Sequence, residues 1–223
     1  MEGANSFNNT FKGESFEVLN GPGAFASDSH FYDSASQLLY EGLSVDPIFN
    51  NKSHFFASGG GVVRLTLNDS ALGILTGTAH GLDVFKINDR ATLLVTAPGQ
   101  IDPKARIQSI ELNGGKLIIL PSGNSSSVAE NVAVGSIHVN HGTVAFGDAR
   151  PQSGHYVGLN VDTIDGPGGT LVFNTSLASK TGNVLTAKSI GQGTYNLLLN
   201  DAVDSKALTL NTLVQASELK LFR

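Results

Sequence analysis

The stretch Ile110-Glu-Leu-Asn-Gly-Gly-Lys-Leu-Ile-Ile119 decides the fold class. It places apolar residues at alternate positions on both sides of an Asn-x-Gly corner, and the pattern returns 27 positions later as Ile137-His-Val-Asn-His-Gly-Thr-Val-Ala-Phe146. A looser copy runs from residues 159–162 to residues 169–173, with residues 164–168 inserted between them. Recurrence at such a spacing is typical of repeat proteins, in which each unit buries its apolar face against its neighbours.

Two short strands joined by a tight corner in every unit predict a parallel β-helix. In such a coil alternate side chains point into the bore and stack on the same positions of the coils above and below. Asn at the corner tolerates the left-handed conformation and can hydrogen-bond to its counterparts along the stack, while Gly supplies a positive φ. The alternative explanation of Asn-Gly between strands is an antiparallel hairpin. Two near-copies at a fixed offset favour the solenoid.

Other segments divide the chain into regions. Further strand-like segments, bounded by Gly, Asn, Asp, Ser or Pro, are residues 62–67, 91–96, 158–162, 183–187, 195–199 and 207–210. Residues 57–155 are therefore expected to form regular coils. Residues 1–56 hold most of the aromatic residues and show a weaker strand rhythm, which predicts an irregular N-terminal part of the same solenoid, with an excursion over residues 28–48. The best helix candidate is a single short turn within residues 33–40.

Composition excludes several classes of function. The net charge of −5 argues against a nucleic-acid binder, which usually carries a basic stripe. The chain has no Cys, so cysteine-ligated zinc, iron–sulfur clusters, thiol catalysis and disulfides are impossible. No apolar run approaches the length of about 18 residues that a membrane-spanning helix needs.

Candidate catalytic and metal-binding residues are sparse. His138 and His141 are three residues apart, which on a strand places them on opposite faces, a poor arrangement for a shared metal. The carboxylate pairs Asp162/Asp165 and Asp201/Asp204 have the spacing of surface or turn residues. A Ser-His-Asp set stays open because geometry defines it, but no Gly-x-Ser-x-Gly elbow is present. We therefore expect no catalytic residue, cofactor or metal in this chain, and no enzyme activity.

The last part of the chain carries a family resemblance. Residues 159–174 and 182–199 resemble the C-terminal end of autotransporter passenger domains, the autochaperone segment of Gram-negative type V secreted proteins such as the pertactin and immunoglobulin A protease families. Gly166, Gly168, Leu171 and Phe173 match the first block of the family pattern, and the second block is matched by Leu185, Gly193, Leu197 and Leu199. The chain departs from the pattern at Asn183-Val184 and at Ile190.

This resemblance implies a right-handed, single-stranded parallel β-helix at the surface of a Gram-negative bacterium. The passenger would be exported through a C-terminal translocator β-barrel of the same polypeptide, and the lack of Cys would suit passage of an unfolded chain. Residues 156–223 would nucleate folding and cap the last coil, which otherwise exposes apolar faces and unpaired strand edges. The folding core would comprise Leu159, Val161, Ile164, Gly166, Gly168, Leu171, Phe173, Leu185, Gly193, Leu197 and Leu199.

Three functions are compatible with these observations. The first is a non-catalytic passenger fragment of a secreted outer-membrane virulence factor, with an adhesin as parent and a host surface, or a second copy held through polar Asn, Thr and Ser rows, as partner. The second is the stalk of a secreted serine protease whose catalytic domain lies upstream. The third is a carbohydrate-active β-helix of the tailspike or lyase kind, which predicts stacked carboxylates, whereas the two repeat copies offer Glu111 and His138 at equivalent positions.

Overall fold

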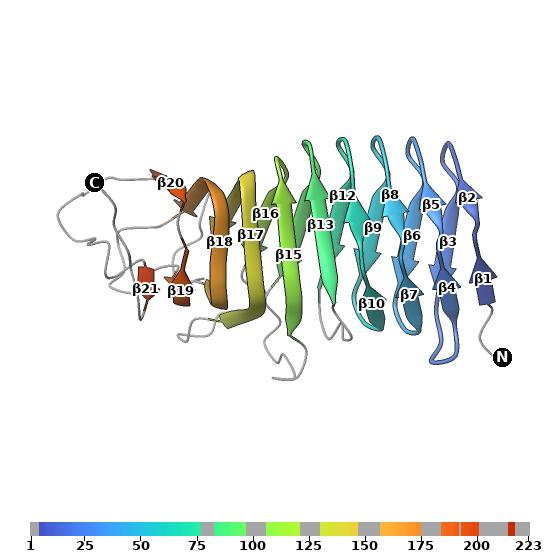
Figure 1. Cartoon of the computed structure of the whole chain (residues 1–223). Helices are drawn as coiled ribbons and strands as arrows, with labels where there is room; N and C mark the ends of the chain where they lie inside the picture. The colour runs from blue at the N-terminus through green and yellow to red at the C-terminus, as the bar shows by residue number, and fades with distance from the viewer. Residues whose placement is uncertain are drawn as a thin grey trace.

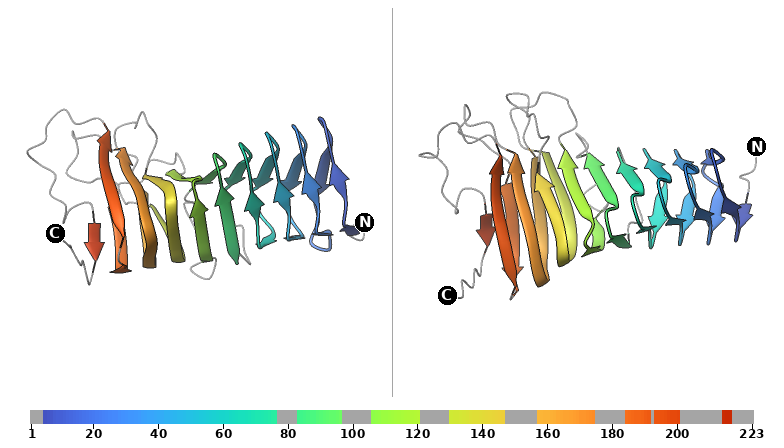
Figure 2. Two further views of the ribbon diagram at one scale, coloured as in Figure 1. Left: turned by 45° about the horizontal axis from the view of Figure 1, so that its top comes forward. Right: turned by 90° about the horizontal axis from the view of Figure 1, so that it is seen from above.

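The computed structural model describes residues 5–76, 83–96, 106–120, 130–146, 157–174, 184–191, 193–200 and 214–216. Within these residues the chain forms strands and no helix, so no described helix could cross a membrane. The strands lie side by side along one axis, from β1 at one end to β20 and β21 at the other (Figures 1 and 2). Every named strand pair is parallel. The predicted all-β parallel β-helix is confirmed, and the antiparallel hairpin is wrong.

The N-terminal coils each contain three short strands. The first coil has β1 (Asn5–Phe7), β2 (Thr10–Phe11) and β3 (Phe16–Leu19), and the second has β4 (Phe25–Ser27), β5 (His30–Phe31) and β6 (Ser36–Leu39). The third has β7 (Leu43–Val45), β8 (Ile48–Phe49) and β9 (His54–Ala57), and the fourth has β10 (Gly61–Val63), β11 (Thr66–Leu67) and β12 (Leu72–Leu75). Each strand pairs with its counterpart 18 or 20 residues later, as His30 does with Thr10 and Ile48.

Residues 28–48 therefore lie inside regular coils, and the predicted excursion is wrong. The helix candidate at residues 33–40 contains β6 instead. The strands here are two to four residues long, so each contributes only one or two inward side chains, too few to reveal an alternating pattern. The division of the chain at residues 56 and 155 stays a prediction.

The C-terminal coils are longer and contain longer strands. They comprise β13 (Val84–Asn88), β14 (Thr92–Thr96), β15 (Ile107–Asn113), β16 (Lys116–Leu120), β17 (Glu130–Phe146), β18 (Val157–Asn174), β19 (Val184–Ile190), β20 (Thr194–Asn200) and β21 (Val214–Ala216). Ile110 pairs with Ile137 and Ile137 pairs with Ile164, which confirms the 27-residue repeat. Leu159 pairs with Val132 rather than with Ile137, so residues 164–168 continue the repeat and are not an insertion.

Alternate side chains fill the bore along the whole described length. On the β2 side, the rings of Phe11 and Phe31 stack with centroids 4.8 Å apart, and those of Phe31 and Phe49 with centroids 4.5 Å apart. The same inward row continues through Leu67, Ile87, Leu112 and Val139. From Phe31 onward every member of this row is fully buried. Burial of this continuous row favours the coiled conformation over the extended chain.

The corner between the two main faces carries the predicted Asn ladder. Each Asn side chain donates from Nδ2 to the Oδ1 of the preceding coil, at distances of 2.8–2.9 Å. The ladder consists of Asn50, Asn68, Asn88 and Asn113. The left-handed conformation falls on the residue after each Asn, namely Asn51, Asp69, Asp89 and Gly114. The structure thus separates two roles that the sequence pattern assigned to one residue.

Candidate functional site

The apolar residues of the predicted folding core line the bore of the C-terminal coils. Leu159, Val161 and Ile164 on β18 are buried and pair with Leu185, Ala187 and Ile190 on β19. Leu171, from the other face of β18, and Leu185 are also buried. The structure therefore brings these predicted residues into one contiguous cluster across neighbouring coils.

The two predicted glycines of the β18 corner are required by the backbone. Gly166 and Gly168 have φ values of +104° and +123°, which side chains rarely adopt. A Cβ on Gly166 would lie 2.5 Å from the carbonyl oxygen of Val139, and one on Gly168 would lie 2.0 Å from that of Thr194. These glycines allow neighbouring coils to approach at the corner.

The remaining predicted core residues lie on or before β20. A Cβ on Gly193 would lie 2.5 Å from the carbonyl oxygen of Gly166, so this glycine also permits close coil contact. Phe173 pairs in register with Leu199, and Leu171 pairs with Leu197. Their backbone positions continue the rows of the preceding coils.

An ion-pair bridge that sequence reasoning missed ties three coils together on the outside of these strands. Asp162 accepts hydrogen bonds from the Arg106 guanidinium through Oδ2 and from Lys188 Nζ through Oδ1, the latter at 2.7 Å. These bonds, with that of Lys188 the larger, hold the pKa of Asp162 below its usual value. Gly135 lies in register between Arg106 and Asp162, and a Cβ there would be only 3.2 Å from Arg106 Nη2. The glycine lets the Arg106 side chain pass over its coil.

A second row of polar contacts follows the outward face of β13, β15, β17 and β18. Lys86 Nζ lies 3.3 Å from Glu111 Oε2, and His138 Nδ1 lies 2.7 Å from Asp165 Oδ1. Glu111 and His138 are paired in register, as expected from the sequence. Charges of both signs alternate along this row, which differs from the stacked carboxylates that a carbohydrate-active groove would need.

The candidate metal and carboxylate positions are accounted for as follows. His138 is engaged by Asp165, and His141 occupies an exposed corner position with φ of +60°. No group of three metal-ligating side chains occurs among the described residues. Asp162 is held by Arg106 and Lys188, whereas Asp201 and Asp204 lie outside the described residues.

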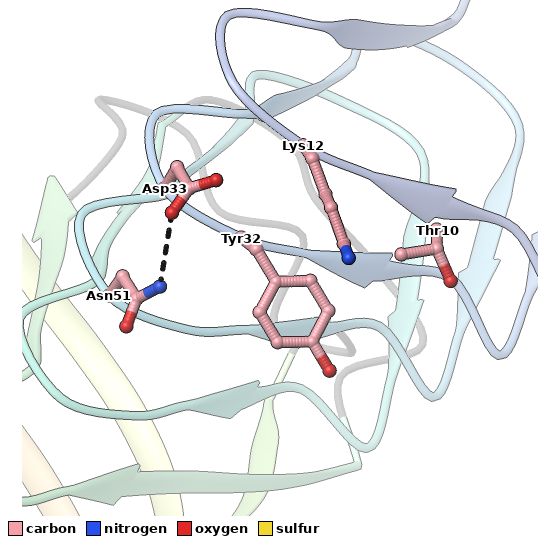
Figure 3. Close-up of a pocket in the computed structure, with 5 residues that line it drawn as sticks. All are labelled: Thr10, Lys12, Tyr32, Asp33 and Asn51. Carbon is pink, nitrogen blue, oxygen red and sulfur yellow. Dashed lines mark hydrogen bonds between the residues drawn. The ribbon is translucent and has the colours of Figure 1, made fainter.

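A shallow depression at the N-terminal corner is the clearest hollow in the described surface (Figure 3). Thr10, Lys12, Tyr32, Asp33 and Asn51 line it. The Lys12 ammonium lies 5.9 Å from the centroid of the Tyr32 ring, and Asn51 Nδ2 donates to Asp33 Oδ1 at 3.4 Å. The depression is wide open and its residues come from three coils, so no local sequence motif could have identified it.

Stacked parallel coils with an apolar bore place the chain in the class of parallel β-solenoid proteins. Residues 134–219, less than half of the chain, match the family model described as Pertactin. No curated protein and no solved structure matches the chain. The match and the solenoid architecture together fit an autotransporter passenger β-helix, which confirms the resemblance seen in the sequence. The match begins at Val134 in β17, one coil earlier than the resemblance suggested.

Proposed function

We propose that this chain is a non-catalytic passenger segment of a Gram-negative autotransporter and that residues 156–223 act as its autochaperone, nucleating and capping the β-helix. The observation that carries the proposal is the position of the Pertactin match, which covers β18, β19 and β20 at the C-terminal end of the described coils.

Repeat energetics explain why one end would have this role. A solenoid gains stability mainly from contacts between adjacent coils, so folding needs one formed coil on which the next can pack. Forming that first coil is the costly step because it orders many residues before it gains neighbour contacts. The glycine corner of β18 and its buried aliphatic row supply close contact on both sides of this coil.

The site of action follows from the same family match. An autotransporter passenger works outside the cell, so the proposed location is the bacterial surface and the proposed covalent partner is a translocator β-barrel of the same polypeptide. We further propose that the parent protein is an adhesin and virulence factor. Its support is the long, regular outer surface of the coils, which repeats each side-chain position at intervals of about 5 Å.

The folding role is tested with two matched substitutions in one inward row. Ile110 and Ile164 are both buried, and each pairs with Ile137 from opposite sides. Replacing either by Ala should cost about 2–5 kcal/mol. If β18 belongs to the nucleus, Ile164→Ala should mainly slow refolding, whereas Ile110→Ala should mainly speed unfolding.

Stopped-flow refolding and unfolding of both variants measures this difference. Equal effects on the two folding rates, or a larger slowing for Ile110→Ala, would contradict the proposed nucleus. A truncation provides an independent check, because residues 57–155 alone should aggregate. If that fragment stays monomeric with unchanged thermal stability, residues 156–223 are not the cap.

The adhesin assignment needs a separate measurement. Beads coated with the folded chain should bind host epithelial cells more strongly than beads coated with the same chain after heat denaturation. Equal retention of the two kinds of bead would remove the support for adhesion by this segment.

A further inference from the structure

The outer surface of the solenoid carries an unbroken row of apolar side chains. It follows the middle outward position of the strands in register with β3, and its members pair from coil to coil. This apolar row comprises Val18, Leu38, Phe56, Ile74, Leu94, Ile118, Ala145 and Val172. Outward positions of a solvated sheet are normally polar, so eight successive apolar residues require an explanation.

The positions beside the row enlarge the apolar surface at its N-terminal end. Phe16, on the same face, has 67% of its surface exposed, and the exposed fractions of Val18 and Tyr40 are 43% and 42%. The ring of Tyr40 packs edge-on against that of Phe56, with centroids 6.2 Å apart. Leu72 adds a further apolar side chain beside Ile74. Three of the four most exposed large apolar side chains in the described surface therefore lie on this one face.

The face is also nearly free of charge. Among the described outward positions of these strands, Lys116 is the only Lys, Arg, Asp or Glu, and most flanking residues are Ser or Thr. The face formed by β13, β15, β17 and β18 instead carries the alternating ion pairs described above. A chain with a net charge of −5 repels its copies in general, and this uncharged face is where that repulsion is weakest.

We propose that the apolar row is a self-association surface that a second copy of this chain covers, giving a two-fold dimer of solenoids packed side by side. The area is sufficient for this. Eight strands about 4.8 Å apart and about five residues of strand width enclose about 600 Å² per copy, or about 1,200 Å² in the dimer, the lower limit of specific interfaces. A two-fold axis presents the same row from both copies, and a flat, repeating row is self-complementary.

This inference goes beyond the proposed function and differs from the polar contacts that the sequence suggested. The Asn ladder is already satisfied along each coil stack, since each Nδ2 in it has an acceptor. Covering the apolar row releases water from surface that has no such partner. The apolar row, and not the corner Asn residues, holds the two copies together.

The test compares one substitution on two faces. Ile74 lies in the middle of the apolar row, and Ile48 is an outward, half-buried residue of β8 on the other face. Sedimentation of the 223-residue chain should give twice the 23.3 kDa monomer mass at about 50 μM, because interfaces of this size have micromolar or lower Kd values. Ile74→Lys should raise the Kd at least about 30-fold by burying an ammonium at the interface centre. Ile48→Lys should leave the Kd unchanged.

A second readout guards against misfolding of the lysine variant. The chain contains no Cys, so Leu94→Cys and Ile48→Cys each introduce a unique thiol. Alkylation of the thiol at position 94 should slow as protein concentration rises through the Kd, while that at position 48 should stay constant. A wild-type chain that is monomeric at this concentration, a dimer unaffected by Ile74→Lys, or concentration-independent alkylation at position 94 would overturn the proposal. In the first case a different occupant covers the row.

Discussion

The N-terminal coils, residues 5–75, and the C-terminal coils, residues 107–200, follow one stacking rule with two coil lengths. In the first region Thr10 pairs with His30 and His30 with Ile48, at offsets of 20 and 18 residues. In the second region Glu111 pairs with His138 and His138 with Asp165, each at an offset of 27 residues. The register of inward rows continues through the change, so coil length can vary without interrupting the bore.

The two regions also fill the bore differently. Phenyl rings stack in the N-terminal coils, where a polar chain also runs from Ser44 Oγ through Gln37 to the Glu17 carboxylate. The described inward positions of the C-terminal coils hold mainly Leu, Ile and Val, and ion pairs across coils lie on the outside. The Pertactin match covers only coils of the second kind. The comparison teaches that the stack is modular, with local filling that sets local stability.

The largest expected effect comes from removing a ring in the N-terminal bore. Phe49 is fully buried, with its ring centroid 4.5 Å from that of Phe31 and 5.4 Å from that of Phe55. Phe49→Ala should cost about 3–5 kcal/mol through lost burial and a cavity. Since each coil contacts mainly its neighbours, the loss should stay in the N-terminal coils.

Hydrogen exchange resolves where that loss is felt. In Phe49→Ala, amides of β5, β8 and β11 should lose protection while those of β17–β19 keep it. Leu112→Ala, in the same inward row, is the matched control and should expose β13–β17 instead. Uniform loss of protection in both variants would mean that the solenoid unfolds as a single cooperative unit, against the modular interpretation.

A glycine comparison gives the next largest effect. Gly13 and Gly166 both have positive φ, of +66° and +104°, and lie at corners of the two regions. A Cβ on Gly13 would meet no atom within 4 Å, whereas one on Gly166 would clash with Val139. Gly166→Ala should therefore lower the free energy of unfolding by more than the 1–2 kcal/mol that about one left-handed Ala costs at Gly13. Urea denaturation measures both values, and equal losses would show that coil spacing at Gly166 can relax.

The sequence was most informative where coils repeat at constant length. The 27-residue recurrence between residues 110 and 137 identified the parallel stack and the Asn ladder, because both depend on equal spacing and on strands long enough to show alternation. Residues 5–56 did not reveal their coils. β5 and β8 contribute one buried Phe each, and the left-handed Asp residues between such strands have the composition of loops.

The outer surface could not be predicted because it depends on register. Arg106 and Asp162 are 56 residues apart, and their contact requires two unequal coil lengths and a glycine at position 135. The apolar row has the same origin. Leu72 and Ile74 look like ordinary alternate strand residues until the pairing with β9 and β14 aligns them with other outward apolar residues.

The smallest expected effect concerns the surface ion pairs, one from each region. A hydrogen bond from Arg64 holds the pKa of Asp46 below its usual value of 3.8, and bonds from Lys188 and Arg106 do the same for Asp162. A carboxyl whose folded pKa is depressed contributes stability above its unfolded pKa, and this contribution is lost as the pH falls through the folded pKa. The thermal midpoint of the wild-type chain should therefore fall below about pH 4.

Asp162→Asn and Asp46→Asn should each reduce that fall slightly, because these side chains are largely solvated and exposed ion pairs contribute little. High salt should shrink the difference from wild type further. Asp162 bridges coils on both sides of Gly135, while Asp46 joins only adjacent coils, so Asp162→Asn should have the larger effect. Thermal melts at pH 7 and pH 3 decide the order. If Asp46→Asn has the larger effect, the three-coil bridge adds nothing beyond a simple ion pair, and the stability of the C-terminal coils rests on their bore alone.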